Sequence, residues 1–231
     1  MSQTLNAKQR VALHAAELIE DGMVVGLGTG STANYFIEAL VERQRQGLEV
    51  ITVASSIVSM RIAQEAGLKQ LSLDQISKLD IYVDGADEVA PEMVLLKGRG
   101  QDLVREKLLA RASEQFFVLV DQTKMVNNVG ENFAIPVEVI PFAWQMVLAS
   151  LQELGGKGQL RANASGDGLA VTSYGSLVLD MTFEKGFDVE TLNAQLNAVP
   201  GIVEHGIFTN LATAIFVGNA DGVSEHKKET S

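Results

Sequence analysis

Cysteine is absent from this 231-residue sequence, and histidine is scarce. Without cysteine the chain has no disulfides, no Cys nucleophile and no Cys-based zinc or iron–sulfur site. The three histidines, His14, His205 and His226, are widely separated and leave little material for a histidine metal cluster. Any metal chemistry would need carboxylates, and we expect no metal cofactor.

Long apolar runs are also missing. No stretch approaches the roughly 18 apolar residues of a membrane span, and the segment from Met1 to Arg10 lacks the apolar core of a signal peptide. The net charge of −11, from 29 acidic and 18 basic residues, repels phosphate backbones on average. We therefore expect a cytoplasmic protein that binds neither membranes nor nucleic acid.

The composition is that of a globular protein, with 46% hydrophobic and 20% charged residues. In the first half of the chain, short apolar runs alternate with segments of helical periodicity. Strands are expected at 23–28, 50–54, 81–83 and 115–120, and helices at 4–20, 31–41, 57–67 and 102–113. This alternation predicts an α/β fold with an open, mostly parallel sheet and helices on both faces, which is a Rossmann-like arrangement.

The pattern changes near Asn132. The order of elements becomes β-α-β-β-α-β, which predicts a smaller α+β domain of the ferredoxin-like type. Its elements are a strand at 135–140, a helix at 141–154, two strands around 165–168 and through 176–183, a helix at 188–197 and a strand at 202–208. We expect residues 1–131 and 206–231 to form the α/β catalytic domain and 132–205 the small domain.

The end of the chain carries one more apolar segment. Residues 212–218 are expected to return to the first sheet as a strand. The polar tail from Ser224 to Ser231 is expected to be frayed.

Ligands in open α/β sheets bind at the carboxyl ends of the strands. The first such segment is Gly26-Leu27-Gly28-Thr29-Gly30-Ser31-Thr32, whose glycines allow a tight turn and whose end opens a helix. Free N–H groups at a helix start favour an anion, so a phosphate site is predicted. The alternative is a turn needed only for helix packing. Ser31 stands where a dinucleotide fingerprint needs glycine, and Gly30 stands where a triphosphate loop needs lysine.

The second segment is Asp84-Gly85-Ala86-Asp87-Glu88, directly after an expected buried strand. Two carboxylates three residues apart suit proton transfer or the binding of hydroxyls. They would also suit a divalent metal, or a purely structural helix cap or Asx turn.

Two further segments carry charge. Lys97-Gly98-Arg99-Gly100 can place an ammonium against an oxyanion or phosphate, although basic loop residues are usually just solvated. Glu106 lies on the following helix, where it either supports exposed intrahelical ion pairs or faces the ligand above the strand ends.

In this order and spacing, the four segments resemble ribose-5-phosphate isomerase of the A type. The resemblance extends through residues 119–124, 136–141 and 200–203, and it covers essentially the whole chain. It implies interconversion of D-ribose 5-phosphate and D-ribulose 5-phosphate without a metal or organic cofactor. It also implies a homodimer or homotetramer and a place in the non-oxidative pentose phosphate pathway.

By motif, Glu106 matches the catalytic base, and Asp84, Asp87 and Lys97 match the polar groups around the reacting end of the sugar. The substrate-contacting residues implied by the resemblance are Thr29, Gly30, Ser31, Thr32, Asp84, Gly85, Ala86, Asp87, Lys97, Gly98, Arg99, Gly100 and Lys124. Lys8 on the first helix is a further candidate for phosphate contact. The chemistry fits, because aldose–ketose isomerisation needs one base and one group that stabilises an oxyanion.

The sequence departs from the family after the lysine-glycine pair, where small residues are usual and this chain has Arg99, Gln101 and Asp102. We expect Arg99 to point into solvent. Asp102 lies four residues before Glu106 on the expected helix, and we hypothesise that its charge raises the pKa of the base slightly.

Two other functions remain open. One is a sugar-phosphate-sensing effector domain of the same fold, as in some transcription regulators, although no basic helix-turn-helix segment precedes Met23. The other is a relative that handles CoA or processes sugar amines. Formation of ketose from ribose 5-phosphate would separate all three.

Overall fold

The computed structural model describes residues 5–100, 102–219 and 222–228. By their contacts the described residues form two compact units. One consists of those within Met1–Ala86, Arg105–Met125 and Leu211–Ser231, and the other of those within Asp87–Val104 and Val126–Asn210. This division assigns residues 87–104 to the second unit, because the strands of this segment pair with a strand at 207–208. The domain boundaries expected from the sequence, at 131/132 and 205/206, stay a prediction.

The first unit is built on a seven-stranded sheet in the order β14-β13-β7-β4-β1-β2-β3. All neighbouring strands are parallel except β13 and β14, so the mostly parallel sheet predicted from the sequence is confirmed. The strands are β1 (Val24–Leu27), β2 (Ile51–Ala54), β3 (Lys69–Gln70), β4 (Leu79–Asp84), β7 (Ser113–Asp121), β13 (Ala214–Gly218) and β14 (Val223–Lys227).

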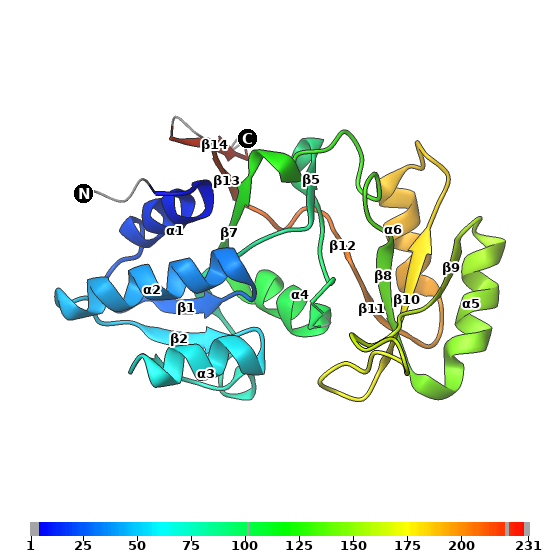
Figure 1. The fold of residues 1–231 in the computed structure, drawn as a ribbon, viewed down its shortest axis with the longest axis horizontal. Helices are drawn as coiled ribbons and strands as arrows, with labels where there is room; N and C mark the ends of the chain where they lie inside the picture. The colour runs from blue at the N-terminus through cyan, green and yellow to red at the C-terminus, as the bar shows by residue number, and fades with distance from the viewer. Residues whose placement is uncertain (1–4, 101, 220–221, 229–231) are drawn as a thin grey trace. The chain divides into compact units, whose positions relative to one another are not determined.

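Helices cover both faces of this sheet. The helices are α1 (Ala7–Glu17), α2 (Ser31–Arg45), α3 (Ile57–Glu65) and α4 (Leu103–Ala112). Helices α1 and α2 lie side by side on one face (Figure 1), where Phe36 and Phe216 belong to one buried cluster. The opposite face presents Tyr82 and Phe116, whose rings stack at 4.9 Å between centroids. Since strand residues alternate in direction, one strand supplies both faces.

The second unit contains the β-α-β-β-α-β order predicted from the sequence. Its antiparallel sheet has the order β11-β8-β10-β9. The elements are β8 (Ile135–Val139), α5 (Trp144–Glu153), β9 (Lys157–Leu160), β10 (Leu177–Thr182), α6 (Val189–Ala198) and β11 (Ile202–His205). Pro141 begins a short 3₁₀ turn, η4 (Pro141–Ala143), that precedes α5.

A three-stranded sheet in the order β12-β6-β5 was not foreseen. It consists of β5 (Glu88–Ala90), β6 (Val94–Leu96) and β12 (Ile207–Phe208), with η2 (Pro91–Met93) between the first two strands. The single strand expected at 202–208 is therefore wrong, because it divides at Gly206 into β11 and β12. The Gly206 N–H donates to the Pro136 carbonyl at 2.8 Å, and a Cβ at Gly206 would lie 2.3 Å from the Lys97 carbonyl oxygen.

The chain end also differs from expectation. Residues 223–227 form the edge strand β14 against β13, so the frayed tail expected from Ser224 is wrong for this part. Backbone pairing with β13 supplies hydrogen bonds that polar composition does not signal. The tail residues 229–231 lie outside the described residues, as do Thr4 and Gln101. Within the described part of the chain, no helix has the length and apolar character needed to span a membrane.

One carboxylate is buried in the sheet of the second unit. Glu138 on β8 is 1% exposed, and its Oε1 accepts a hydrogen bond from the Thr172 hydroxyl at 2.9 Å. Burial is the largest influence on the pKa of Glu138 and raises it, and the charges of Asp102 and Glu204 raise it further. The hydroxyls of Thr172 and Ser176 oppose this shift.

We expect the Glu138→Gln variant to gain thermal stability relative to the parent as pH rises. The raised pKa means that the folded state holds a proton that the unfolded chain releases, so parent stability falls as pH rises through the folded-state pKa. The Tm difference between variant and parent should grow by a few degrees between about pH 4 and about pH 8. A difference that stays constant over this range would contradict the assignment.

Candidate active site

The glycine turn after β1 is held against the end of β4. The Gly28 N–H donates to the Val83 carbonyl at 2.9 Å, and the Thr29 N–H donates to Oδ1 of Asp84 at 3.1 Å. A Cβ on Gly28 would lie 2.0 Å from this same oxygen. Only glycine fits at position 28, so the turn has a requirement beyond helix packing.

Helix α2 begins directly after this turn. Gly30 precedes it with φ +106° and provides no side-chain cap, so the first N–H groups of the helix have no partner from that side chain. Lys8 on α1 donates from Nζ to the Ser31 hydroxyl at 3.0 Å. A helix N-terminus beside an ammonium group favours an anion, and the phosphate site expected at Ser31 and Thr32 stays a prediction.

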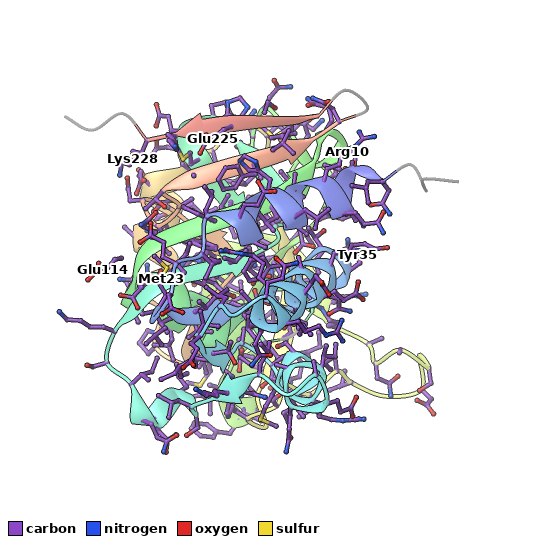
Figure 2. All side chains as sticks on the ribbon, turned by 90° about the vertical axis from the view of Figure 1, so that its left-hand side faces the viewer. Arg10, Met23, Tyr35, Glu114, Glu225 and Lys228 are labelled. Atoms are coloured by element: carbon purple, nitrogen blue, oxygen red, sulfur yellow. The ribbon has the colours of Figure 1, made fainter. Side chains whose placement is uncertain are left out.

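A hollow of about 730 Å³ adjoins the start of α2. Lys8 and Ser31 line it together with Arg10 and Tyr35, which lie at one edge of the paired helices α1 and α2 (Figure 2). Thr123 lines it from η3 (Gln122–Lys124), the turn that follows β7. The hollow is large enough for a small phosphorylated metabolite.

Thr29 points toward a neighbouring loop. Its hydroxyl is hydrogen-bonded to Ser55 Oγ at 2.9 Å and to Ser56 Oγ at 2.7 Å, both in the turn between β2 and α3. The side chains of Ser55 and Ser56 thus fix the turn that carries Thr29.

Asp84 ends β4 and is 1% exposed. Its Oδ1 accepts hydrogen bonds from the N–H groups of Thr29 and Gly85, at 3.1 and 2.7 Å, and its Oδ2 accepts one from the Tyr82 hydroxyl at 2.5 Å. Burial raises the pKa of Tyr82 well above its usual range, and the charges of Asp84 and Glu106 add to this. Tyr82 therefore stays a neutral donor to Asp84. Gly85 and Ala86 follow, and both are half-buried.

Glu106 is buried, at 5% exposure, on α4. The charge of Glu106 helps to raise the pKa of Tyr82, whose hydroxyl donates to Asp84. The two carboxylates therefore lie on the Tyr82 face of the first unit. The neighbouring Lys107 is 3% exposed. The alternative of an exposed helical charge is wrong for Glu106, and sequence reasoning missed both Tyr82 and the burial of Lys107. The spacing of Tyr82 and Asp84, two residues apart on one strand, places them on one face and was available as a signal.

Lys124 lies in η3 and is half-buried. Asp121 caps this turn by accepting hydrogen bonds from the backbone and hydroxyl of Thr123. The cap fixes the backbone that carries Lys124, at the end of the same sheet as Asp84.

The other predicted site residues lie in the second unit. Lys97, which follows β6, is 4% exposed, and its Nζ lies 5.8 Å from the centroid of the Phe208 ring. Its N–H donates to the Gly206 carbonyl at 2.9 Å. Gly98 has φ +96°, and a Cβ there would meet the side chain of Leu103 at 2.9 Å. The structure thus buries the lysine and requires glycine after it.

The carboxylate of Asp87 binds the backbone of Arg99. The Asp87 N–H donates to the Leu96 carbonyl at 2.9 Å, and its Oδ2 accepts from the Arg99 N–H at 3.3 Å. Arg99 is exposed, but its guanidinium carbon lies 3.9 Å from the Phe133 ring centroid, so the side chain packs on that ring and does not simply point into solvent as expected. Gly100 is exposed as well.

Asp102 accepts a hydrogen bond from the Ser173 hydroxyl at 2.7 Å. The effect of Asp102 on the pKa of Glu106 stays a prediction. A pH–rate profile of Asp102→Ala that matches the parent's would remove it.

Among the described residues, no group of three or more His, Asp or Glu side chains is placed to hold a metal ion. In the first unit, the glycine turn, the helix start and two buried carboxylates come from the carboxyl side of one sheet. These features define an α/β protein whose glycine turn and helix start have the chemistry that suits a small phosphorylated ligand. The family model described as ribose 5-phosphate isomerase A (phosphoriboisomerase A) matches residues 51–222. The chain belongs to this family.

Individual relatives are similar to this chain over nearly its full length. The ribose-5-phosphate isomerase A of Prochlorococcus marinus is 42% identical over 228 residues, covering 96% of this chain and 97% of that protein. The one from Thermococcus kodakarensis is also 42% identical, with the same coverage. The solved ribose 5-phosphate isomerase A of Methanocaldococcus jannaschii superposes with a TM-score of 0.91 at 38% identity, covering 96% of this chain and 98% of that one.

Two further similarities bear on function. A solved D-ribose-5-phosphate isomerase in complex with phospho-erythronic acid has a TM-score of 0.92 and 38% identity, covering 96% of this chain and 98% of that one. The family model described as the DeoR C terminal sensor domain matches residues 3–71. That second match covers less than a third of the chain, and the matched residues include the glycine turn and its flanking elements.

Proposed function

We propose that this protein interconverts D-ribose 5-phosphate and D-ribulose 5-phosphate. The observation that carries the proposal is the burial of Glu106 beside the Tyr82–Asp84 pair in a chain that belongs to this isomerase family. Burying a carboxylate costs free energy. A buried carboxylate such as Glu106 is therefore a stronger candidate for a catalytic group than an exposed glutamate on a helix surface.

In the proposed reaction, Glu106 removes the proton from C2 of the open-chain aldose and returns it to C1. The electron pair of the broken C–H bond forms the C1–C2 double bond of an enediolate, and the carbonyl electrons move onto O1. The proton of the C2 hydroxyl leaves as C2 becomes the carbonyl, and O1 receives one. The Lys97 ammonium stabilises the enediolate oxygen, and no outside oxidant or reductant is needed.

The two aspartates have separate proposed roles. Asp84 opens the cyclic sugar by moving a proton between the ring oxygen and the anomeric hydroxyl. Asp87 orients hydroxyls, and its hydrogen bond to the Arg99 N–H ties it to the loop that carries Lys97. The other residues proposed to contact the sugar phosphate are 29–32, 85–86, 98–100 and 124.

The phosphate is proposed to bind where α2 begins, through the N–H groups of Ser31 and Thr32 with Lys8 and Lys124 as cations. We expect Lys124→Ala to raise KM about tenfold with a smaller loss in kcat, because a phosphate contact made equally in substrate and transition state is uniform binding. Steady-state kinetics over a range of ribose 5-phosphate concentrations measure both. If kcat collapsed at unchanged KM, Lys124 would belong to the chemistry.

The test of the proposed function is the appearance of ketose when purified protein is mixed with ribose 5-phosphate. We expect turnover to persist after dialysis against EDTA, since the proposal uses neither a metal nor an organic cofactor. A sensor domain, the alternative that the DeoR-type match favours, would bind the sugar phosphate and form no ketose.

A cytoplasmic homodimer or homotetramer that acts in the non-oxidative pentose phosphate pathway completes the proposal. Phe142 and Met146 of the second unit are 88% and 74% exposed, and such large apolar side chains are usual where subunits meet. Light scattering of the purified protein measures the oligomeric state, and a monomer at micromolar concentration would contradict the assembly.

A further inference from the structure

The loop that follows β6 is held by an arginine from the small antiparallel sheet. Arg161 comes directly after β9, and its N–H donates to the Val178 carbonyl at 2.8 Å. Its Nη1 donates to two successive loop carbonyls, those of Gly98 at 3.1 Å and Arg99 at 3.2 Å. The side chain is only 13% exposed, so these hydrogen bonds are partly shielded from water.

Asp180 fixes the plane of this guanidinium group. Its two carboxylate oxygens accept from Nε and Nη2 of Arg161, at 2.9 and 2.5 Å. Asp180 lies on β10, which pairs with β9 with Gln159 opposite Asp180. A bidentate pair uses one edge of the guanidinium group and leaves Nη1 for the loop, an arrangement that a lysine ammonium cannot reproduce.

The two carbonyl contacts set the direction of two loop N–H groups. In a trans peptide the C=O and N–H bonds point in opposite directions. The peptide between Gly98 and Arg99 is held at both ends, because its carbonyl binds Arg161 and its N–H donates to Asp87. In the next peptide the Arg99 carbonyl binds Arg161, so the Gly100 N–H points away from Arg161.

We propose that Arg161 is a positioning residue for the isomerase reaction. It holds the loop from Lys97 to Gly100 so that the Lys97 ammonium and the Gly100 N–H are presented to the substrate, and Asp180 holds Arg161. The inference rests on the proposed function. It goes beyond that function because Arg161 and Asp180 contact neither the substrate nor its reacting atoms in this assignment.

The test compares Arg161→Met, Arg161→Lys and a control, Lys157→Met, in the parent background. Lys157 is an exposed cation on β9, the strand that directly precedes Arg161, so the control removes an equal charge without touching the loop. We expect Arg161→Met to lower kcat about 10- to 100-fold, with KM for ribose 5-phosphate within about threefold, because a small displacement of catalytic groups costs rate more than binding. The control should match the parent.

The lysine variant separates positioning from general stabilisation. We expect Arg161→Lys to recover the melting temperature while kcat stays about tenfold or more below the parent, since one ammonium cannot serve Asp180 and both carbonyls. Full recovery of kcat by lysine, or a kcat of Arg161→Met within twofold of the parent's, would overturn the proposal.

Amide hydrogen exchange gives a readout that does not depend on turnover. The Arg99 N–H, held by Asp87, should exchange faster in Arg161→Met than in Lys157→Met, while amides of the first unit stay unchanged. If the parent forms no ketose, the proposed function is wrong, whatever the exchange data show. If exchange of the Arg99 N–H is the same in Arg161→Met as in Lys157→Met, Arg161 does not hold the loop, whether or not the parent is an isomerase.

Discussion

Replacing Glu106 by Gln is expected to lower kcat by about 10² to 10⁴ while ribose 5-phosphate still binds. The amide keeps the shape of the side chain and cannot accept the proton from C2. Because Glu106 is buried near Tyr82, the substitution also removes a charge from a site with little water. Steady-state kinetics give kcat, and calorimetric titration gives the affinity.

The control for this variant is Glu114→Gln. Glu114 is an exposed glutamate on β7 of the same unit, labelled in Figure 2. Its replacement removes the same charge and should leave kcat unchanged. A Glu106→Gln enzyme with a kcat near that of the parent would refute Glu106 as the base.

The second large effect is expected from Gly28→Ala. The new Cβ would lie 2.0 Å from Oδ1 and 2.6 Å from Cβ of Asp84, and Asp84 cannot move aside without losing its hydrogen bonds to Tyr82 and Thr29. We expect a loss of about 1–3 kcal/mol in the free energy of unfolding. We also expect kcat/KM to fall about 10²-fold, because the turn and Asp84 are displaced together.

Denaturant unfolding and kinetics measure the two effects of Gly28→Ala. Gly222→Ala is the matched control, since a Cβ at Gly222 would meet nothing within 4 Å. If Gly28→Ala were as stable and as active as Gly222→Ala, the close approach of the turn to Asp84 would be wrong.

Much of the fold could be predicted from local patterns. The alternation of apolar runs with helical segments gave the parallel sheet, and the β-α-β-β-α-β order gave the small antiparallel sheet. These patterns repeat every two or 3.6 residues and depend on local burial. In the sheet formed by β5, β6 and β12, the pairing of β12 with β6 joins residues more than 100 positions apart, and Gly206 carries no local signal for the change of sheet.

The candidate site could be predicted as a set of segments and less well as a set of contacts. Glycines and carboxylates at strand ends pointed to residues 26–32 and 84–88 because a sheet collects its carboxyl ends at one edge. Two features depend on tertiary packing: the hydrogen bonds of the Thr29 hydroxyl with Ser55 and Ser56, and the burial of Glu106. Arg161 lies 62 residues from Arg99 in sequence, and its contact to that loop is visible only in the structure.

The most direct test of the central claim is a crystal structure of the Glu106→Gln variant with ribose 5-phosphate bound. We expect the side chain at position 106 to lie about 3 to 3.5 Å from C1 and C2, and the phosphate to lie on the N–H groups of Ser31 and Thr32. A bound sugar whose C1 and C2 face a different carboxylate, with position 106 directed into solvent, would contradict it.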